Sequence, residues 1–295
     1  MSLTQTRQPA LHAAAVVPQK MRKTPASRRI MTGLRVLGII AVVFVLVAPL
    51  VWMLLASLKT SLDITNPSKT FDFLPTLENY NNVINTQKFL PFILNSFIVA
   101  AGATTVALLV GVPAAYAIAR FKVTNATAFL LLARVIPGVS LLVPWYYVFS
   151  QMGIVGSYGV LILTHIFVTM PLVVAILASF FEGMPLELEE SAQVDGLTRI
   201  GSFARITLPL ATPGIATAAI LSFIFSWNNF LFALVLSNQE TRTLPVAISN
   251  FTAYASVDWG GLMAASVLIT VPVMLVALFA QKYVVAGLTA GATKG

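Results

Sequence analysis

Cysteine is absent from the 295-residue sequence, and histidine occurs only twice. The missing cysteine excludes disulfides, thiol catalysis and thiolate metal sites, and two histidines are too few for a histidine-based metal cluster. Charge is also scarce, because Asp, Glu, Lys and Arg make up 9% of the residues, against about 25% in an average soluble domain. So few charges would not cover a water-facing surface, which indicates a polytopic membrane protein.

Apolar residues form 58% of the chain and are gathered in long runs. A membrane-spanning helix needs about 20 predominantly apolar residues, and in lipid its backbone polar groups must be satisfied internally. We therefore expect an all-α fold, with six transmembrane helices at about 36–58, 91–119, 126–150, 158–181, 211–236 and 262–285. Arg134, inside the third span, either faces a cavity or partner, or extends its side chain to the interface.

Lysine and arginine are distributed unevenly between the predicted spans. With the N-terminus inside, thirteen of the 18 cations lie on the cytoplasmic side and four lie outside. Cytoplasmic loops carry an excess of cations, so we expect both termini, and the loop at 184–209, in the cytoplasm. The net charge of +8 does not indicate nucleic-acid binding, because the cations flank apolar segments instead of forming one basic face.

The N-terminal segment, residues 1–30, is polar and contains three prolines. It is predicted to be a flexible cytoplasmic tail, followed by one transmembrane domain over residues 31–295. A cleaved signal peptide is the alternative. The first apolar run has 23 residues, longer than the core of about 7–15 residues that a signal peptide carries, which favours a retained span.

The polar loop at 184–209 interrupts two uncharged stretches and has the local signals of two short helices. Pro185 suits the first position of a helix, and three glutamates in the first turns complement the helix dipole. Gly196 suits the residue just past the helix end. Thr198 is a suitable N-cap for a second helix through about Arg205. The loop is therefore predicted to form a helix, a glycine turn and a second helix.

The same loop resembles the cytoplasmic signature of the permease subunits of binding-protein-dependent ABC transporters. The family pattern is Glu-Ala-Ala, three residues, Gly, nine residues, and Ile-x-Leu-Pro. This chain keeps both spacings, with serine in place of the middle alanine: Glu190, Ser191, Ala192, Asp195, Gly196, Ile206, Leu208 and Pro209. Further stretches, including Ala114–Arg120 and Phe225–Phe230, resemble the maltose-type carbohydrate permeases over roughly residues 30–295.

This resemblance implies an ABC importer type I permease fold in the inner (plasma) membrane of a prokaryote. The signature loop would be a coupling helix that docks on a cytoplasmic ATPase, present in two copies. A second, homologous permease and an external solute-binding protein would complete the system, with a carbohydrate as substrate. The chain has no Gly-Lys dipeptide and hence no P-loop, so ATP would be bound by the ATPase, and this chain would be neither an enzyme nor in need of a cofactor.

Five polar or aromatic residues inside the predicted spans are candidates for the translocation path, because amides and aromatic faces suit sugars: Trp227, Asn228, Asn229, Tyr146 and Tyr147. Two alternatives stay open. Asparagine is common in hydrogen bonds between membrane helices, and tyrosine is enriched at membrane interfaces. His165 is interpreted as a hydrogen-bonded packing residue and not as a proton relay.

Two other classes of function fit less well. A secondary transporter driven by an ion gradient usually carries carboxylates inside its spans, whereas all ten acidic residues lie in loops or at loop edges. A membrane-embedded enzyme would need a catalytic motif such as H-E-x-x-H or paired intramembrane aspartates, and the sequence contains neither.

Overall fold

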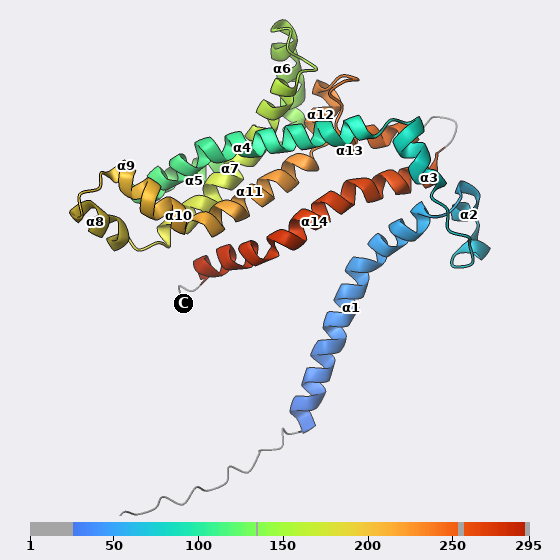
Figure 1. Cartoon of the computed structure of the whole chain (residues 1–295), viewed down its shortest axis with the longest axis horizontal. Coiled ribbons are helices and arrows are strands. Elements are labelled where there is room, and N and C mark those ends of the chain that lie inside the picture. Colours follow the sequence, from blue (N-terminus) through green and yellow to red (C-terminus); the bar gives the residue numbers. More distant parts are fainter. Residues whose placement is uncertain (1–25, 134, 253–256, 293–295) are drawn as a thin grey trace, which may run out of the picture. The chain divides into compact units, whose positions relative to one another are not determined.

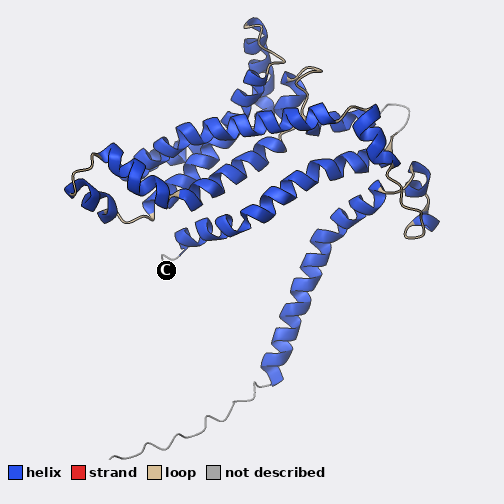
Figure 2. Ribbon diagram, viewed as in Figure 1, coloured by secondary structure: helices blue, strands red, loops and turns tan. Residues whose placement is uncertain are grey.

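The computed structural model describes residues 26–133, 135–252 and 257–292, and within them every regular element is a helix (Figures 1 and 2). Most of the predicted tail at 1–30, and Arg134, lie outside the described residues. The chain divides into two units, residues 1–50 and 51–295. The first unit contributes the greater part of helix α1 (Ala26–Ser57), and the second contains all the other elements.

Four helices are long and apolar enough to cross a membrane. They are α1, α4 (Leu90–Arg120), α7 (Tyr158–Glu182) and α14 (Trp259–Ala292). They overlap the first, second, fourth and sixth predicted spans. A fifth candidate combines the run Arg199–Leu210 with α11 (Thr212–Trp227), which meet at 71°. The structure thus supports four or five spans by length and composition, and the six-span topology stays a prediction.

The third predicted span, 126–150, is not one helix. It is divided into α5 (Thr124–Ala133) and α6 (Gly138–Gln151). Pro137 explains the division, because the residue before a proline is driven out of the helical region, and Pro137 itself is extended, with φ −59° and ψ 124°. An apolar run long enough for one span is thus interrupted by a single proline.

The fifth predicted span, 211–236, is also divided. Helix α11 ends at Trp227, and α12 (Leu231–Leu236) begins after a break of three residues. The side-chain oxygen of Asn229 accepts a hydrogen bond from the backbone N–H of Phe232 at 3.2 Å, in the manner of an N-cap. This hydrogen bond stabilises the first turn of the new helix.

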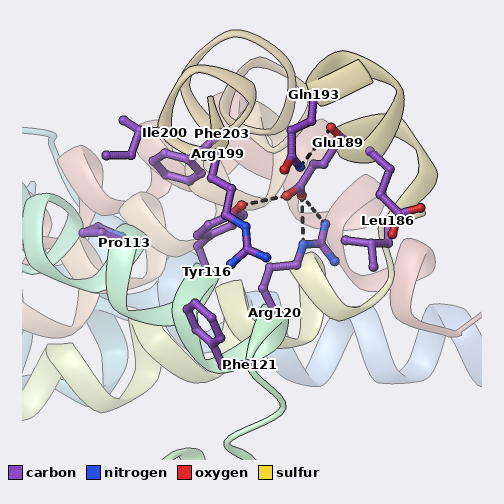
Figure 3. Close-up of a pocket in the computed structure, with 11 residues that line it drawn as sticks. Pro113, Tyr116, Arg120, Phe121, Leu186, Glu189, Gln193, Arg199, Ile200 and Phe203 are labelled. Carbon is purple, nitrogen blue, oxygen red and sulfur yellow. Dashed lines mark hydrogen bonds and ion pairs between the residues drawn. The ribbon is translucent and has the colours of Figure 1, made fainter. Parts of the chain in front are cut away.

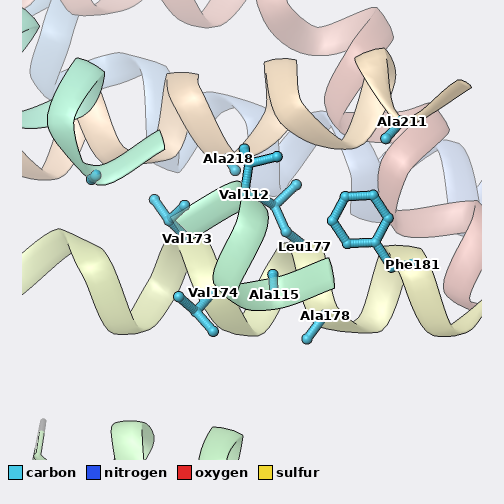
Figure 4. Close-up of a cluster of buried hydrophobic side chains, with 10 residues drawn as sticks. Val112, Ala115, Val173, Val174, Leu177, Ala178, Phe181, Ala211 and Ala218 are labelled. Carbon is cyan, nitrogen blue, oxygen red and sulfur yellow. The ribbon is translucent and has the colours of Figure 1, made fainter. Parts of the chain in front are cut away.

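One of three buried apolar clusters in the second unit lies between α4, α7 and α11 and is rich in small side chains. Ten buried residues form it, half of them alanines, and Figure 4 draws all ten and labels nine: Val112, Ala115, Val173, Val174, Leu177, Ala178, Phe181, Ala211 and Ala218. Small residues let membrane helices approach closely. Two glycines mark close approaches in this cluster, since an added Cβ would lie 2.8 Å from Val173 at Gly111 and 2.7 Å from the Phe180 ring at Gly214.

Short helices connect the long ones on the side predicted to be external. Between α1 and α4 lie α2 (Ser61–Thr65), a 3₁₀ turn (Pro67–Lys69), α3 (Glu78–Asn81) and a π-helical turn (Asn82–Thr86). Between α12 and α14 lie α13 (Leu244–Ala247) and a 3₁₀ turn (Ile248–Phe251). Asn95 of α4 contacts the loop between α12 and α13, because its Nδ2 donates to the carbonyls of Glu240 and Arg242 at 2.7 and 2.9 Å.

Lys59 is a buried cation in the first connecting segment and is only 2% exposed. Its Nζ donates to the carbonyl oxygens of Lys69 and Thr70 at 3.1 and 2.6 Å. It also lies 5.0 Å from the ring centre of Trp52 and 4.6 Å from that of Phe73. The carbonyls and the ring faces together compensate for the lost hydration of the ammonium group.

Replacing Lys59 with alanine is expected to loosen the segment between α1 and α3, because the ammonium group joins residues 69–73 to the end of α1. The measurement is limited proteolysis of the purified protein, with faster cleavage within residues 60–76 as the expected result. Lys69→Ala is the matched control, since the Lys69 side chain is half exposed and pairs only with exposed Asp72 at 3.7 Å. Equal cleavage of the two variants would contradict the anchoring role of Lys59.

Candidate functional site

The signature loop folds as two short helices joined at Gly196. Helix α8 (Glu187–Val194) ends in a Schellman motif, in which the N–H of Leu197 donates to the Ala192 carbonyl and that of Gly196 to Gln193. Gly196 has φ +93°, a conformation that glycine adopts at little cost. The predicted turn glycine therefore has the predicted conformation.

The second helix of the loop starts at the predicted cap. The Thr198 hydroxyl accepts from the Gly201 N–H at 3.1 Å, and α9 (Arg199–Ser202) follows. The helical run does not stop near Arg205, as predicted. It continues as a π-helical turn (Phe203–Thr207) and α10 (Leu208–Leu210), because Pro209 lies in the first turn of α10, where a missing N–H does no harm. The bend into α11 comes at Ala211.

The start of the first helix also differs from the prediction. Pro185 lies outside α8, whose first residue is Glu187 and whose N-cap is Leu186. The acidic first turn is present as expected, with Glu187, Glu189 and Glu190. The helix is therefore one turn of apolar and acidic residues followed by the small residues of the signature.

Glu189 is the chemically distinctive residue of this loop, because it is a carboxylate that is only 4% exposed. Its Oε2 accepts from the Tyr116 hydroxyl at 2.6 Å. Its Oε1 accepts from Arg120 Nε at 2.8 Å and lies 2.6 Å from a terminal guanidinium nitrogen of the same arginine. Figure 3 shows the three side chains converging. Tyr116 and Arg120 belong to the last turns of α4, so α8 is bonded directly to a predicted span.

Arg120 extends the connection to the end of α7. Its second terminal nitrogen donates to the carbonyl oxygens of Phe181 and Met184, at 3.0 and 3.4 Å. Carbonyls at a helix C-terminus have no partner within the helix, and a guanidinium group there also complements the dipole. One arginine therefore joins α4, the end of α7 and α8.

The ionised form of Glu189 is favoured by these contacts. Burial by itself raises the pKa of a carboxyl group, but the hydrogen bonds from Tyr116 and Arg120, together with the Arg120 charge, outweigh it and hold the pKa of Glu189 below its ordinary value. The carboxylate is accordingly charged at neutral pH. Its bonds are charge-assisted and stronger than neutral ones.

A cavity of about 620 Å³ opens beside this cluster. Its wall comes from the end of α4 and from the loop: Pro113, Tyr116, Arg120, Phe121, Leu186, Glu189, Glu190, Gln193, Arg199, Ile200 and Phe203. Glu190 and Arg199 are exposed, and they present one charge of each sign to it. The cavity lining thus combines a buried ion pair with exposed charges of both signs.

The profile of the family described as binding-protein-dependent transport system inner membrane component matches residues 107–290. The chain belongs to this family. The matched region contains the loop, the cluster at Glu189 and the helices α7, α11 and α14. The protein is therefore the permease subunit of an ABC transport system in a membrane. Such a subunit is not an enzyme and needs no cofactor of its own. ATP is hydrolysed on a separate subunit.

Curated relatives support the same assignment. The sulfoquinovosyl glycerol transport permease of Agrobacterium fabrum is 39% identical over 84% of this chain and 88% of its own. The trehalose permease of Mycobacterium tuberculosis is 35% identical over 84% and 92%, and the trehalose/maltose permease of Thermococcus litoralis 35% over 89% and 96%. The family implies an ATPase, a second permease and a binding protein as partners. The matches give no support to a secondary transporter.

A solved structure has the same fold. A chain of a bacterial ABC transporter that imports the acidic polysaccharide alginate superimposes with a TM-score of 0.73, covering 88% of the permease and 99% of that chain. The two sequences are 19% identical. The all-α permease fold predicted from the sequence is confirmed at this level.

The signature residues fall into an exposed and a packed set. Exposed are Glu190, Ser191, Asp195, Gly196 and Pro209, whereas Ile206 and Leu208 are half-buried and Ala192 is buried. Ala192 is 7% exposed and packs within this chain. Its part in docking the ATPase stays a prediction.

The candidate path residues lie in different environments. Trp227 is 2% exposed, donates from Nε1 to the Ile269 carbonyl of α14 at 3.3 Å and stacks on Phe223. These contacts join α11 to α14, and a place on the translocation path stays a prediction. The side-chain oxygen of Asn229 accepts from the Phe232 N–H at the start of α12. Asn228 is exposed, with its Nδ2 bonded to the Ile224 carbonyl at 2.9 Å.

Tyr146 and Tyr147 are both exposed on α6, where they remain candidates for the path or for the membrane interface. His165 is buried in α7, and its Nδ1 lies 2.7 Å from the Ser226 hydroxyl of α11. This hydrogen bond between two packed helices agrees with the interpretation of His165 as a packing residue.

Three residues of the site were missed by the sequence analysis: Glu189, Tyr116 and Arg120. Their sequence signals are weak but present. Tyr116 and Arg120 are four residues apart, which places them on one helix face, at the end of a span whose sequence matched the family. Glu189 directly precedes the signature. Pairing the two across 69 residues needed the tertiary structure.

Proposed function

We propose that this permease carries a carbohydrate, received from an external solute-binding protein, into the cytoplasm of a prokaryote. The observation that carries the proposal is the substrate class of the relatives. The three relatives described above are named as permeases for sulfoquinovosyl glycerol, for trehalose, and for trehalose and maltose. A Streptomyces coelicolor permease that is 32% identical over 85% of this chain is named for diacetylchitobiose. All of these substrates are sugars or glycosides.

The energy for transport would enter through the signature loop, over residues 184–209. Glu190, Ser191, Asp195 and Gly196 are exposed on one short segment, and they are the residues proposed to contact the ATPase. Two ATPase copies would serve this permease and a homologous second permease, whose facing surfaces enclose the path. The candidates for contact with the sugar are Asn228, Tyr146 and Tyr147, which are exposed, together with Trp227 and Asn229.

The proposed orientation places both termini and the signature loop in the cytoplasm, in a multi-pass topology across the plasma membrane. Its support is the excess of cations on that side of the predicted spans. The connecting segments around Lys59 and Asn95 would then face the binding protein.

Transport tests the proposal directly. Proteoliposomes containing the permease, its cognate second permease and its ATPase would be given the binding protein and radiolabelled trehalose, maltose, diacetylchitobiose or sulfoquinovosyl glycerol. ATP-dependent accumulation of at least one sugar is expected. Uptake by the permease alone, driven by a proton or sodium gradient without ATPase, would contradict the proposal.

Reversing the charge of Glu190 is expected to weaken docking of the ATPase. Glu190→Lys should reduce the ATPase that co-purifies with the permease by about tenfold or more, since reversing one charge contact in an interface costs at least about 1.4 kcal/mol. Glu187→Lys is the matched control, because Glu187 is exposed in the first turn of the same helix. Equal co-purification of both variants would remove Glu190 from the docking surface.

A further inference from the structure

Three elements meet at Glu189 through side-chain contacts that the signature pattern does not include. The Glu189 carboxylate bonds to Tyr116 and Arg120 of α4, and Arg120 bonds to the carbonyls that end α7. We propose that Glu189, Arg120 and Tyr116 form the joint through which displacement of α8 by the ATPase is transmitted to α4 and α7. This inference rests on the proposed docking of the loop.

The joint is needed because α8 has little else to hold it to the spans. Of its eight residues only Glu189 and Ala192 are buried, and Ala192 offers a single methyl group. Apolar burial on that scale is weak and has no preferred direction. The carboxylate contacts are directional, with donors at 2.6 and 2.8 Å, and they fix the position of α8 against the end of α4.

The same residue ties the two halves of the loop together. The backbone carbonyl of Glu189 accepts from the Ser202 hydroxyl at 3.3 Å and from Gln193 Nε2 at 3.1 Å. Ser202 lies at the end of α9, and its side chain is fully buried. Movement of α8 is therefore passed to the second helix of the loop and not absorbed at the Gly196 turn.

Aromatic packing supports the cluster from the side of α4. The Tyr116 ring lies 4.4 Å from the ring of Phe203 in the loop and 5.7 Å, edge-to-face, from that of Phe181 in α7. Such ring pairs stabilise a contact beyond simple burial. Tyr116 thus touches the same elements as Arg120, which gives the joint contacts on both sides.

The neighbouring residues Glu189 and Glu190 have different proposed roles. Glu190 is exposed at the cavity rim and is proposed to meet the ATPase, whereas Glu189 is buried against α4. Consecutive helix residues point about 100° apart, so one short helix presents an outer contact and an inner contact at the same level. A displacement of Glu190 by the ATPase would therefore be passed to α4 through the neighbouring residue, Glu189.

The experiment that tests this inference measures movement of α4 in response to nucleotide. Because the chain has no cysteine, Gln87→Cys provides a single reporter just before the outer end of α4, at an exposed position. Its reaction rate with a maleimide would be measured in nanodiscs containing the full transporter, with and without ATP and vanadate. Each variant would also be assayed for co-purified ATPase and for thermal unfolding.

Glu189→Ala is expected to retain the ATPase. The change in reporter rate that ATP and vanadate cause should become about tenfold smaller than in the parent, because losing hydrogen bonds to a charged group has an effect of this size. Glu189→Gln should recover part of the change, because the amide oxygen accepts from Arg120 and the amide nitrogen donates to Tyr116. Glu187→Ala and Glu187→Gln, which alter an exposed neighbour, should respond as the parent does.

Two results would overturn the inference. One is a full reporter response in Glu189→Ala with the ATPase bound. The other is loss of the ATPase together with the response, which would reduce Glu189 to a support for the docking surface. If Glu189→Ala does not fold, Glu189→Gln decides, since a response equal to that of Glu187→Gln excludes the joint. Failure of the parent itself to bind ATPase would instead reject the proposed function.

Discussion

Replacing Arg120 with methionine is expected to destabilise the permease by about 3–5 kcal/mol, because it leaves a buried carboxylate without its cation. The two side chains are 13% and 5% exposed, so solvent would not compensate. The carbonyls of Phe181 and Met184 would lose a donor as well. The measurement is the thermal unfolding midpoint in detergent, where a large decrease is expected.

Two comparisons make this result specific to the ion pair. Lys122→Met removes an exposed cation two residues away and should leave the midpoint unchanged. Arg120→Met combined with Glu189→Leu should recover most of the loss, since replacing both members of a buried pair by apolar residues is often close to neutral. A midpoint for Arg120→Met equal to that of Lys122→Met would show that the pair contributes nothing to folding.

Gly214→Leu is expected to prevent normal packing of α11 on α7. An added Cβ would already lie 2.7 Å from two atoms of the Phe180 ring, and overpacking of this kind costs about 1–3 kcal/mol or more. The expected result is a lower yield of monodisperse protein and a lower unfolding midpoint. Gly159→Leu is the control, because the nearest atom to a Cβ at exposed Gly159 is a flexible hydroxyl 3.7 Å away. Similar behaviour of the two variants would show that the α7–α11 contact can adjust.

The fold class and the two-helix form of the loop were predictable because they depend on local or compositional signals. The positive φ of Gly196 and the cap at Thr198 follow from the residues within one helical turn. The exact ends of the loop helices did not follow, since Pro185 and Pro209 each suit more than one helix position. Helix boundaries depend on contacts beyond the turn.

The direction in which a side chain faces is not encoded locally. A small residue such as Ala192 permits close packing on either side of a helix, and the sequence does not say which side faces the chain itself. Trp227 is equally ambiguous, because an indole suits a sugar or a helix interface, and the Ile269 carbonyl to which it donates lies 42 residues away. The buried partner of Arg120 was hidden for the same reason.

The bend at Ala211 has a mechanical consequence. Hydrogen bonds run through it, from the Ala211 N–H to the Thr207 carbonyl at 2.8 Å and from the Ile215 N–H to the Ala211 carbonyl at 2.9 Å, so the backbone does not slacken there. The two helices differ in direction by 71°. A displacement along the Arg199–Leu210 axis would therefore be directed mainly across the axis of α11. A push on the signature loop in that direction would tilt α11 sideways more than it would move α11 along its own axis.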